Sequence, residues 1–330
     1  MHSPIRPFLF MLLACLAAAP ARVAAAPAGI TGTPGCRDNP KRVQRLEIKK
    51  PGVYENYLVD GEWVDSNLVK VTADNVTLRH CEIRNGRHNG IVVYAANTVI
   101  DSCRIHHQLN GSFSDQQDAH GITGRPQNLL IRNCEIYYVS GDSLQFDPGR
   151  GAWDNVTVEN CTFWTGPLPA DAANFTKGER PGENALDTKQ RATNPRSRLT
   201  LRNCVFYGWN QPAQIGSVAA LNLKNHVEVT VENCVFRDNE ICFRLRGPGD
   251  GGEYGGAKVT IVNCAVYDSA VALRLEDKIA GLKIERLGLG HGIGKPIVSA
   301  GGGAAPDFVN TGSFSPPPFV ERLQAPARPR

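Results

Sequence analysis

One short phrase recurs seven times along this 330-residue chain, and each copy alternates apolar and polar residues before a cysteine. The copies read NVTLRHCEI, NTVIDSCRI, NLLIRNCEI, NVTVENCTF, RLTLRNCVF, VEVTVENCVF and AKVTIVNCAV, with the cysteines at Cys81, Cys103, Cys134, Cys161, Cys204, Cys234 and Cys264. Successive cysteines lie 22, 31, 27, 43, 30 and 30 residues apart. Self-similarity at such a period predicts a solenoid, in which each repeat stacks on the one before it.

A second alternating strand precedes most copies of the phrase. These strands read GIVVY, HGITG, DSLQFD, NALDTK, AALNLK, ICFRLR and VALRL. Short strands with Gly and Asn at the corners resemble the right-handed parallel β-helix. We therefore predict an all-β, single-stranded right-handed parallel β-helix of about eight coils over residues 46–298, with coils ~4.8 Å apart.

The residues next to the cysteines predict how the coils stack. An asparagine precedes five of the cysteines, at Asn133, Asn160, Asn203, Asn233 and Asn263. We expect these asparagines to form a hydrogen-bonded ladder at one corner, with the cysteines pointing inward as small buried hydrophobes. Zinc is disfavoured because the chain has no CxxC pair. Whether disulfides join adjacent coils stays open, and Cys36 has no obvious partner.

The N-terminus has the features of a secretory signal. Arg6 precedes an apolar run, residues 8–19, and the small residues 23–25 form a cleavage site. The run is too short for a permanent membrane-spanning helix, and the residues after Cys15 disfavour a lipoprotein box. Residues 1–25 are therefore predicted to be removed, and the protein to be secreted or periplasmic. Residues 26–45 are expected to cap the first coil, and residues 299–330 to form a C-terminal tail.

The charge of the mature chain excludes some partners. Removal of residues 1–25 takes away two of the 36 basic residues and leaves 34 basic against 32 acidic ones. Because this balance is nearly neutral, the net charge of the mature chain gives no indication of nucleic-acid binding. No membrane contact is expected after signal cleavage, and the protein is expected to be a monomer.

Side chains from successive coils should form rows along the solenoid. We align the first strands on their inward residues Ile91, Ile122, Leu144, Leu186, Leu221, Phe243 and Leu273. The outward row is then Val92, Thr123, Gln145, Asp187, Asn222, Arg244 and Arg274, followed two residues on by Tyr94, Arg125, Asp147, Lys189, Lys224, Arg246 and Glu276. Acids gather in the two middle coils and bases on either side. The long connections 107–119, 165–183, 190–197 and 247–256 are predicted to wall a groove along this face.

The acids and the lysine of this face match a known pattern. GDSLQFD in one coil and ENALDTK in the next resemble the calcium-dependent pectate lyases, whose coils read GDAI-x-x-D and E-x-x-x-D-x-K. The resemblance implies a Ca²⁺ site built from Glu183, Asp187, Asp142 and Asp147. Calcium prefers several hard oxygen ligands, and strands ~4.8 Å apart can bring such groups together. A plain salt-bridge patch with Lys189 is the alternative.

The resemblance also implies β-elimination on an acidic, uronate-containing polysaccharide. A base must take the proton on C5 while positive charge stabilises the neighbouring carboxylate. Lys189 is one candidate base, if Lys224 and Arg246 lower its pKa. In the family, an arginine in R-x-P is often the base, but this chain has CFRLRG, so Arg244 and Arg246 are the alternative catalytic residues.

Four further residues are predicted to bind the substrate: His120, Arg125, Gln145 and Lys224. His120 is also a candidate second base, although a histidine that only contacts Asp118 fits the sequence equally. Two other functions stay open. A glycoside hydrolase could use Asp147 and Asp187, but the GHG motif at His291 lies far from these acids. A non-catalytic glycan-binding or envelope protein is the third possibility.

Overall fold

The computed structural model describes residues 29–30, 32–149, 151–210, 216, 218–247, 255–276 and 279–300. Within these ranges all regular elements are β-strands, and no helix long and apolar enough to cross a membrane is found. The predicted signal peptide, residues 1–25, and residues 301–330 of the predicted tail lie outside the described residues.

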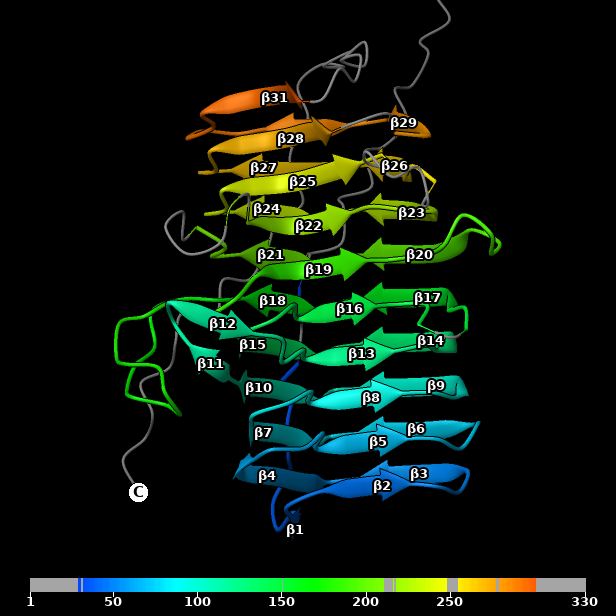
Figure 1. Ribbon diagram of the computed structural model, residues 1–330, viewed down its shortest axis with the longest axis vertical. Helices are drawn as coiled ribbons and strands as arrows, with labels where there is room; N and C mark the ends of the chain where they lie inside the picture. The colour runs from blue at the N-terminus through cyan, green and yellow to red at the C-terminus, as the bar shows by residue number, and fades with distance from the viewer. Residues whose placement is uncertain are drawn as a thin grey trace, which may run out of the picture.

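Three parallel sheets run the length of the stack (Figure 1). The first sheet contains β1 (Lys41–Val43), β4 (Tyr57–Val64), β7 (Glu82–Gly86), β10 (Arg104–Gln108), β15 (Glu135–Val139), β18 (Thr162–Trp164), β21 (Val205–Tyr207), β24 (Val235–Arg237), β27 (Cys264–Tyr267) and β30 (Leu287–Leu289). The second contains β2 (Leu46–Ile48), β5 (Val69–Val71), β8 (Ile91–Val93), β13 (Ile122–Gly124), β16 (Leu144–Phe146), β19 (Asn184–Thr188), β22 (Ala219–Leu223), β25 (Ile241–Arg246), β28 (Val271–Glu276) and β31 (Lys295–Ala300). The third contains β3 (Gly52–Glu55), β6 (Val76–Arg79), β9 (Ala96–Asp101), β14 (Gln127–Arg132), β17 (Asp154–Glu159), β20 (Ser197–Arg202), β23 (Val227–Glu232), β26 (Lys258–Val262) and β29 (Gly281–Ile284).

The predicted all-β parallel β-helix is confirmed, but it has more coils than the expected eight. Two sheets have 10 strands each and the third has nine. The difference arises at the two ends of the stack. The coils there pair in register with their neighbours, as β1 does with β4 and β28 with β31, yet they lack the cysteine phrase on which the repeat was counted.

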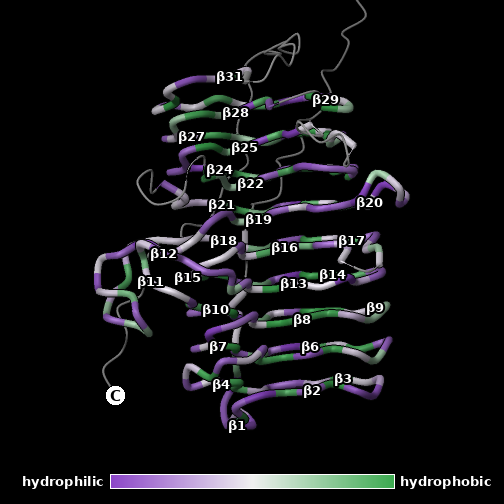
Figure 2. Tube along the Cα trace, viewed as in Figure 1, coloured by the Kyte–Doolittle hydropathy of each residue, from purple (hydrophilic) through white to green (hydrophobic). Residues whose placement is uncertain are grey.

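The interior is filled by the inward residues of all three sheets. The predicted inward row from Ile91 to Leu273 lies in register on adjacent strands of the second sheet, and each of its residues is buried. On the first sheet, the rings of Phe163, Phe206 and Phe236 stack with centroids 5.0 Å apart. Figure 2 shows hydrophobic and hydrophilic stretches alternating along each coil. This alternation gives a continuous apolar core, which is the main stabilising feature of a solenoid.

The predicted cysteine row and asparagine ladder are both present. Cys134, Cys161, Cys204, Cys234 and Cys264 have 0% exposure, and every cysteine among the described residues is a free thiol. Adjacent coils are joined by asparagine side chains: Asn203 donates to Asn160 (3.1 Å), Asn233 to Asn203 (2.6 Å) and Asn263 to Asn233 (2.9 Å). Asn133 departs from the ladder and donates to Asp101 instead (3.1 Å).

The segment expected to cap the first coil lies along the side of the stack. The Gly29 amide donates to the Asn203 carbonyl (2.7 Å), and the Gly35 amide donates to the Ser102 carbonyl (2.9 Å). These partners belong to well-separated coils, and Figure 1 shows the chain running along the stack before it enters β1. The solenoid itself begins earlier than residue 46, because β1 already pairs with β4.

Two predicted wall loops contact each other at one edge of the second sheet. Within loop 107–119, β11 (Asn110–Ser112) and β12 (Asp115–Gln117) form an antiparallel hairpin that projects from the stack (Figure 1). Asn174 of loop 165–183 donates to the Gly111 carbonyl (3.2 Å), and the Gly182 amide donates to Gln116 (3.0 Å). One side of the second sheet is therefore walled as predicted.

Candidate functional site

The outer face of the second sheet carries the predicted row of polar side chains. Gln145, Asp187, Asn222, Arg244 and Arg274 pair in register on β16, β19, β22, β25 and β28. Their neighbours Leu186, Leu221, Phe243 and Leu273 are buried in the core. Because side chains alternate along a strand, this row points away from the core.

Asp187 is a buried acid shared by two lysines. Lys224 Nζ lies 3.0 Å from Asp187 Oδ2, and Lys189 Nζ lies 3.8 Å from the same oxygen. The Asp187 side chain is only 3% exposed, against 18% for Lys224 and 32% for Lys189. The acid therefore lies beneath and the ammonium groups face outward.

The backbone fixes both lysines in place. The Lys189 amide donates to the Phe146 carbonyl (2.9 Å), and its carbonyl accepts from the indole of the buried Trp153 (2.8 Å). The Lys224 amide donates to Thr188 Oγ1 (3.0 Å), and that hydroxyl donates back to the Lys224 carbonyl (3.1 Å). Lys189 and Lys224 thus both lie at the ends of rigid strands, as a preorganised site requires.

Glu276 repeats the arrangement with arginines. It forms a two-pronged pair with Arg244, with both nitrogen–oxygen distances at 3.0 Å. The same carboxylate lies 3.0 Å from Arg246 Nε and 2.6 Å from Arg274 Nε. Its side chain is 10% exposed, so this acid also lies beneath its cations. We call Lys189, Lys224, Arg244 and Arg246, which lie over Asp187 and Glu276, the cation strip.

A cavity of ≈ 320 Å³ opens beside the cation strip. It is lined by Asp147, Pro148, Lys189, Arg191, Lys224, Asn225 and Arg246. Four cations thus surround a space into which one carboxylate, that of Asp147, also points. Such a lining favours an anionic ligand.

The comparisons with known proteins identify the fold. Residues 66–286 match the family described as the right handed beta helix region. The chain belongs to this family. The predicted resemblance is confirmed for the fold, which is a right-handed β-helix.

Several solved structures are similar to this right-handed β-helix. An alginate lyase from Paenibacillus sp. strain FPU-7 is 16% identical, with 83% of this chain and 94% of that chain covered and a TM-score of 0.48. Pectate lyase Pel9A is 13% identical, with 90% and 78% covered and a TM-score of 0.47. A GH87 α-1,3-glucanase from Streptomyces thermodiastaticus strain HF3-3 is 13% identical, with 89% and 73% covered and a TM-score of 0.31. A search of curated proteins found no match.

Lys189 does not have the lowered pKa predicted for a base. Burial opposes its charge, but the carboxylates of Asp187 and Asp147 outweigh that effect and raise its pKa above 10.5. The prediction of a lowered pKa rested on Lys224 and Arg246, whereas the β-helix also places Asp147 3.8 Å from the ammonium group of Lys189. Lys189 is therefore a protonated cation at neutral pH.

Asp142 lies in the floor of the second sheet. It has 0% exposure and accepts hydrogen bonds from Asn184 (2.8 Å) and Gln145 (3.0 Å). Burial, reinforced by the negative charges of Asp187 and Glu183, raises its pKa well above the ordinary value. Gln145, predicted to bind substrate, thus donates its amide nitrogen to Asp142.

His120 is a neutral, buried ring that its neighbours orient. The Asp142 amide donates to His120 Nδ1 (3.0 Å), so the neutral ring carries its proton on Nε2, which faces Asp118 at 3.8 Å. Burial lowers the pKa of His120 to about 4. A ring with this tautomer donates at Nε2 and accepts no proton there. The interpretation of His120 as a second base stays a prediction, and the contact with Asp118 is present.

Arg125 lies apart from the cation strip. Its guanidinium packs over the Tyr94 ring at 5.0 Å, and it is not among the residues that line the cavity. The structure thus brings Lys224 to the cavity but leaves Arg125, another of the predicted substrate-binding residues, outside it.

Of the four predicted calcium ligands, three have other polar partners. Asp187 pairs with Lys224, Asp142 accepts two amide hydrogen bonds, and Asp147 accepts from the Gly149 amide (2.8 Å). Burial and Asp187 raise the pKa of Glu183. Among the described residues, no group of three or more His, Cys, Asp or Glu side chains is placed to hold a metal ion. Calcium therefore stays a prediction.

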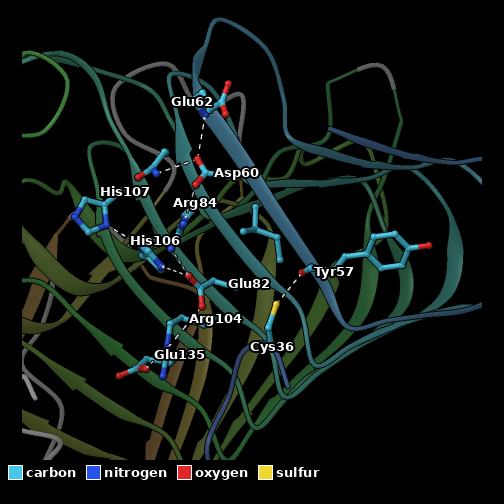
Figure 3. Close-up of polar contacts among 12 residues, drawn as sticks. Cys36, Tyr57, Asp60, Glu62, Glu82, Arg84, Arg104, His106, His107 and Glu135 are labelled. Carbon is cyan, nitrogen blue, oxygen red and sulfur yellow. Dashed lines mark hydrogen bonds and ion pairs between the residues drawn. The ribbon is translucent and has the colours of Figure 1, made fainter. Parts of the chain in front are cut away.

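A second polar cluster lies on the first sheet and was not predicted (Figure 3). Arg84 pairs with Asp60 (2.8 Å) and Glu82 (3.0 Å), and Glu82 lies 3.5 Å from His106 Nε2. Nδ1 of His106 contacts Nδ1 of His107 at 2.6 Å. Each of these charges has an opposite partner, so the cluster joins coils rather than presenting free charge to a ligand.

Two cations in or beside the candidate site were not among the predicted site residues. Arg191 belongs to the predicted wall loop 190–197 and lines the cavity. Arg274 stood in the predicted outward row, and its position opposite Arg244 was the signal that could have identified it. Of the last predicted wall loop, residues 248–254 lie outside the described residues.

Proposed function

We propose that this protein is a secreted enzyme that cleaves an acidic, uronate-containing polysaccharide by β-elimination. The observation that carries the proposal is the cation strip, in which Asp187 and Glu276 lie beneath the cations that face the solvent. Asp187 and Glu276 are 3% and 10% exposed, whereas Lys224, Lys189 and Arg246 are 18%, 32% and 32% exposed, so the charge that a ligand meets on this face is mainly positive. Carboxylates spaced along a polymer fit such a row of exposed cations.

The cations also supply what β-elimination requires. Removal of the C5 proton of a uronate places negative charge on the adjoining carboxylate. Ammonium and guanidinium groups fixed beside that carboxylate stabilise this charge as it develops. We assign this role to Lys189, Lys224 and Arg246, which line the cavity from rigid strand ends. For Lys189 it is the role of an anion clamp, because its raised pKa keeps it protonated.

The elimination moves one proton and breaks one bond. The C5 proton passes to a base, its electron pair forms the C4–C5 double bond, and the C4–O4 bond breaks. O4 leaves with its electron pair and takes up a proton from water to become a hydroxyl group. Asp147 is the only carboxylate among the described residues that line the cavity, and we assign it the proton from C5.

Secretion is the remaining part of the proposal, and it rests on the N-terminal charge, apolar run and small-residue cleavage site of residues 1–25. Sequencing the N-terminus of the exported protein tests it directly. A mature chain that begins near residue 26 is expected. A chain recovered from the cytoplasm with Met1 in place would contradict it.

The activity is tested with polygalacturonate and alginate as separate substrates. An unsaturated uronide absorbs in the ultraviolet, so a lyase gives rising absorbance together with new reducing ends. New reducing ends without absorbance would instead mean a hydrolase, with Asp147 and Asp187 as the candidate pair. Binding without either signal would mean a non-catalytic glycan-binding protein. A neutral polysaccharide of similar length serves as the control substrate.

A further inference from the structure

We propose that the outer face of the third sheet is the interface through which two copies of this chain form a symmetric dimer. The proposal is independent of the proposed function, because this face belongs to a different sheet from the cation strip. It replaces the monomer expected from the sequence with an equilibrium between monomer and dimer.

The charges on this face form stripes, each of which follows one strand. β20 carries two cations, Arg198 and Arg202, and the adjacent β23 carries Glu228 and Glu232 directly opposite them. The flanking strands continue the alternation, with the acids Asp154 and Glu159 on β17 and the cation Lys258 on β26. These strands lie one above another (Figure 1). Successive strands therefore present negative, positive, negative and positive charge.

A row of threonines separates the two charged sides of the face. Thr157, Thr200, Thr230 and Thr260 lie in register on the four strands, and the residues on either side of each threonine are buried. The threonines therefore point outward. The middle of the face is uncharged and made of small side chains, which a second surface can approach closely.

Pairs within the chain hold the stripes in place without covering them. Arg202 lies 3.0 Å from Glu232, and Lys258 lies 2.8 Å from Glu228. Exposed pairs of this kind contribute little to the stability of a fold. The four side chains stay 42–54% exposed in spite of these contacts. They are thus fixed in position and accessible to a partner.

A second copy of the same face carries the complementary stripes. A twofold axis that lies in the interface, parallel to the strands and midway between β20 and β23, places β20 of one protomer over β23 of its partner. The same axis places β17 over β26. Arg202 then faces the partner's Glu232, and Arg198 faces the partner's Glu228. Each contact occurs twice, as in every isologous interface, and each joins opposite charges. Such complementarity determines the register of a complex.

The overlap is large enough for a weak dimer. Three strands of the third sheet, β23, β26 and β29, lie on one side of the proposed axis, so two copies overlap over about six strands. Strands of about 20 Å with a spacing of ~4.8 Å then bury about 600 Å² per copy. The total of about 1,200 Å² lies at the lower end of the range for specific interfaces. We therefore expect a dissociation constant in the micromolar range.

An exchange of charge between the two copies is the direct test. Sedimentation velocity of the full mature chain at about 1–200 μM measures the dimer. We expect the wild type to dimerise, and to do so at least tenfold more weakly in about 1 M salt, which screens exposed charges. Arg202→Glu and Glu232→Arg each place like charges opposite each other and should each weaken the dimer at least tenfold. An equimolar mixture of the two variants should dimerise like the wild type, because every contact then joins opposite charges.

The mixture separates contacts between copies from contacts within one copy. Each variant loses its own pair between positions 202 and 232, and mixing cannot repair that loss inside a single chain. Recovery of the dimer in the mixture therefore reports the interface alone. Thermal unfolding shows that each variant is folded. If either is not, the exchange of Arg198→Glu with Glu228→Arg repeats the test on the other side of the threonine row.

Arg79→Glu is the matched control, because Arg79 pairs with Glu55 (2.9 Å) on β6, outside the overlapping strands. It should dimerise like the wild type. A wild-type chain that stays monomeric at every concentration overturns the proposal, and so does a mixture that dimerises no better than either variant alone. Growth beyond a dimer with rising concentration would mean an open, head-to-tail contact and would overturn the twofold arrangement.

Discussion

Lys224 Nζ lies 3.0 Å from Oδ2 of Asp187, an acid whose side chain is only 3% exposed. The pair shows how the second sheet holds several cations close together. Each buried acid offsets part of the repulsion between the cations above it, as Glu276 does for the arginines two strands away. The ammonium and guanidinium groups face outward, where a polymeric anion can approach them.

Replacement of Lys224 by methionine removes the ammonium group that is closest to Asp187. We expect Lys224→Met to lower turnover of an acidic polysaccharide at least a hundredfold, because a carboxylate stabiliser at the reacting sugar is lost. Initial rates from ultraviolet absorbance measure this effect. Lys258→Met is the control, since Lys258 pairs with Glu228 (2.8 Å) on the third sheet. Turnover by Lys224→Met within threefold of wild type would rule out this role.

Lys189 is expected to act as a charged group, which has a consequence for the pH profile. Its pKa lies above 10.5 because of Asp187 and Asp147. If its neutral amine were the base, kcat/KM would rise about tenfold per pH unit from pH 7 to 10, as the neutral fraction grows. We expect no such rise over this range, and a loss of at least a hundredfold in Lys189→Met. A steady tenfold rise, absent in Lys189→Met, would restore Lys189 as the base.

Much of the fold could be predicted from sequence because the repeat has a strict side-chain period. Once Leu186 was placed inward, Asp187 had to point outward, and the register of the second sheet followed. The pKa values could not be obtained in this way. That of Lys189 depends on the distance to Asp147 in the preceding coil, and that of His120 on its burial. The spacing of the strands determines which residues form a row. The pKa values depend instead on where the charged end of each side chain lies.

The histidines of the first sheet predict acid sensitivity. Burial lowers the pKa of His107 from 6.5 to about 3, so the unfolded chain binds a proton that the folded chain does not. The contribution of His107 to the free energy of unfolding is therefore fully present above pH 6.5 and is lost as the pH falls below that value. From pH 7.5 to pH 5 this loss is about 1–2 kcal/mol for a partly exposed ring.

His107→Asn should remove the part of this pH-dependent loss of stability that comes from protonation of His107. Asparagine suits the positive φ of 55° at this position. Urea unfolding at pH 7.5 and pH 5 measures the difference for wild type and variant. An equal loss of stability in the two proteins between these pH values would show that His107 does not titrate as described.

Asn203 tests the ladder that joins the coils. It donates to Asn160, accepts from Asn233 and has a φ of 53°. Asn203→Ala should lower the free energy of unfolding by about 2–3 kcal/mol, because two hydrogen bonds are lost and alanine is strained at positive φ. Asn203→Gly loses the same bonds without that strain and should cost about 1 kcal/mol less. Denaturant unfolding compares them, and a glycine variant less stable than the alanine variant would contradict the explanation.

The central claim is that a fixed row of cations promotes elimination on a polymer because the polymer carries carboxylates. The most direct measurement compares polygalacturonate with the same polymer after chemical reduction of its carboxyl groups, following ultraviolet absorbance and reducing ends together. We predict rising absorbance and new reducing ends with the native polymer, neither signal with the reduced polymer, and initial rates at least a hundredfold lower from Lys224→Met. Cleavage of the reduced polymer at a rate similar to that of the native one would contradict the account.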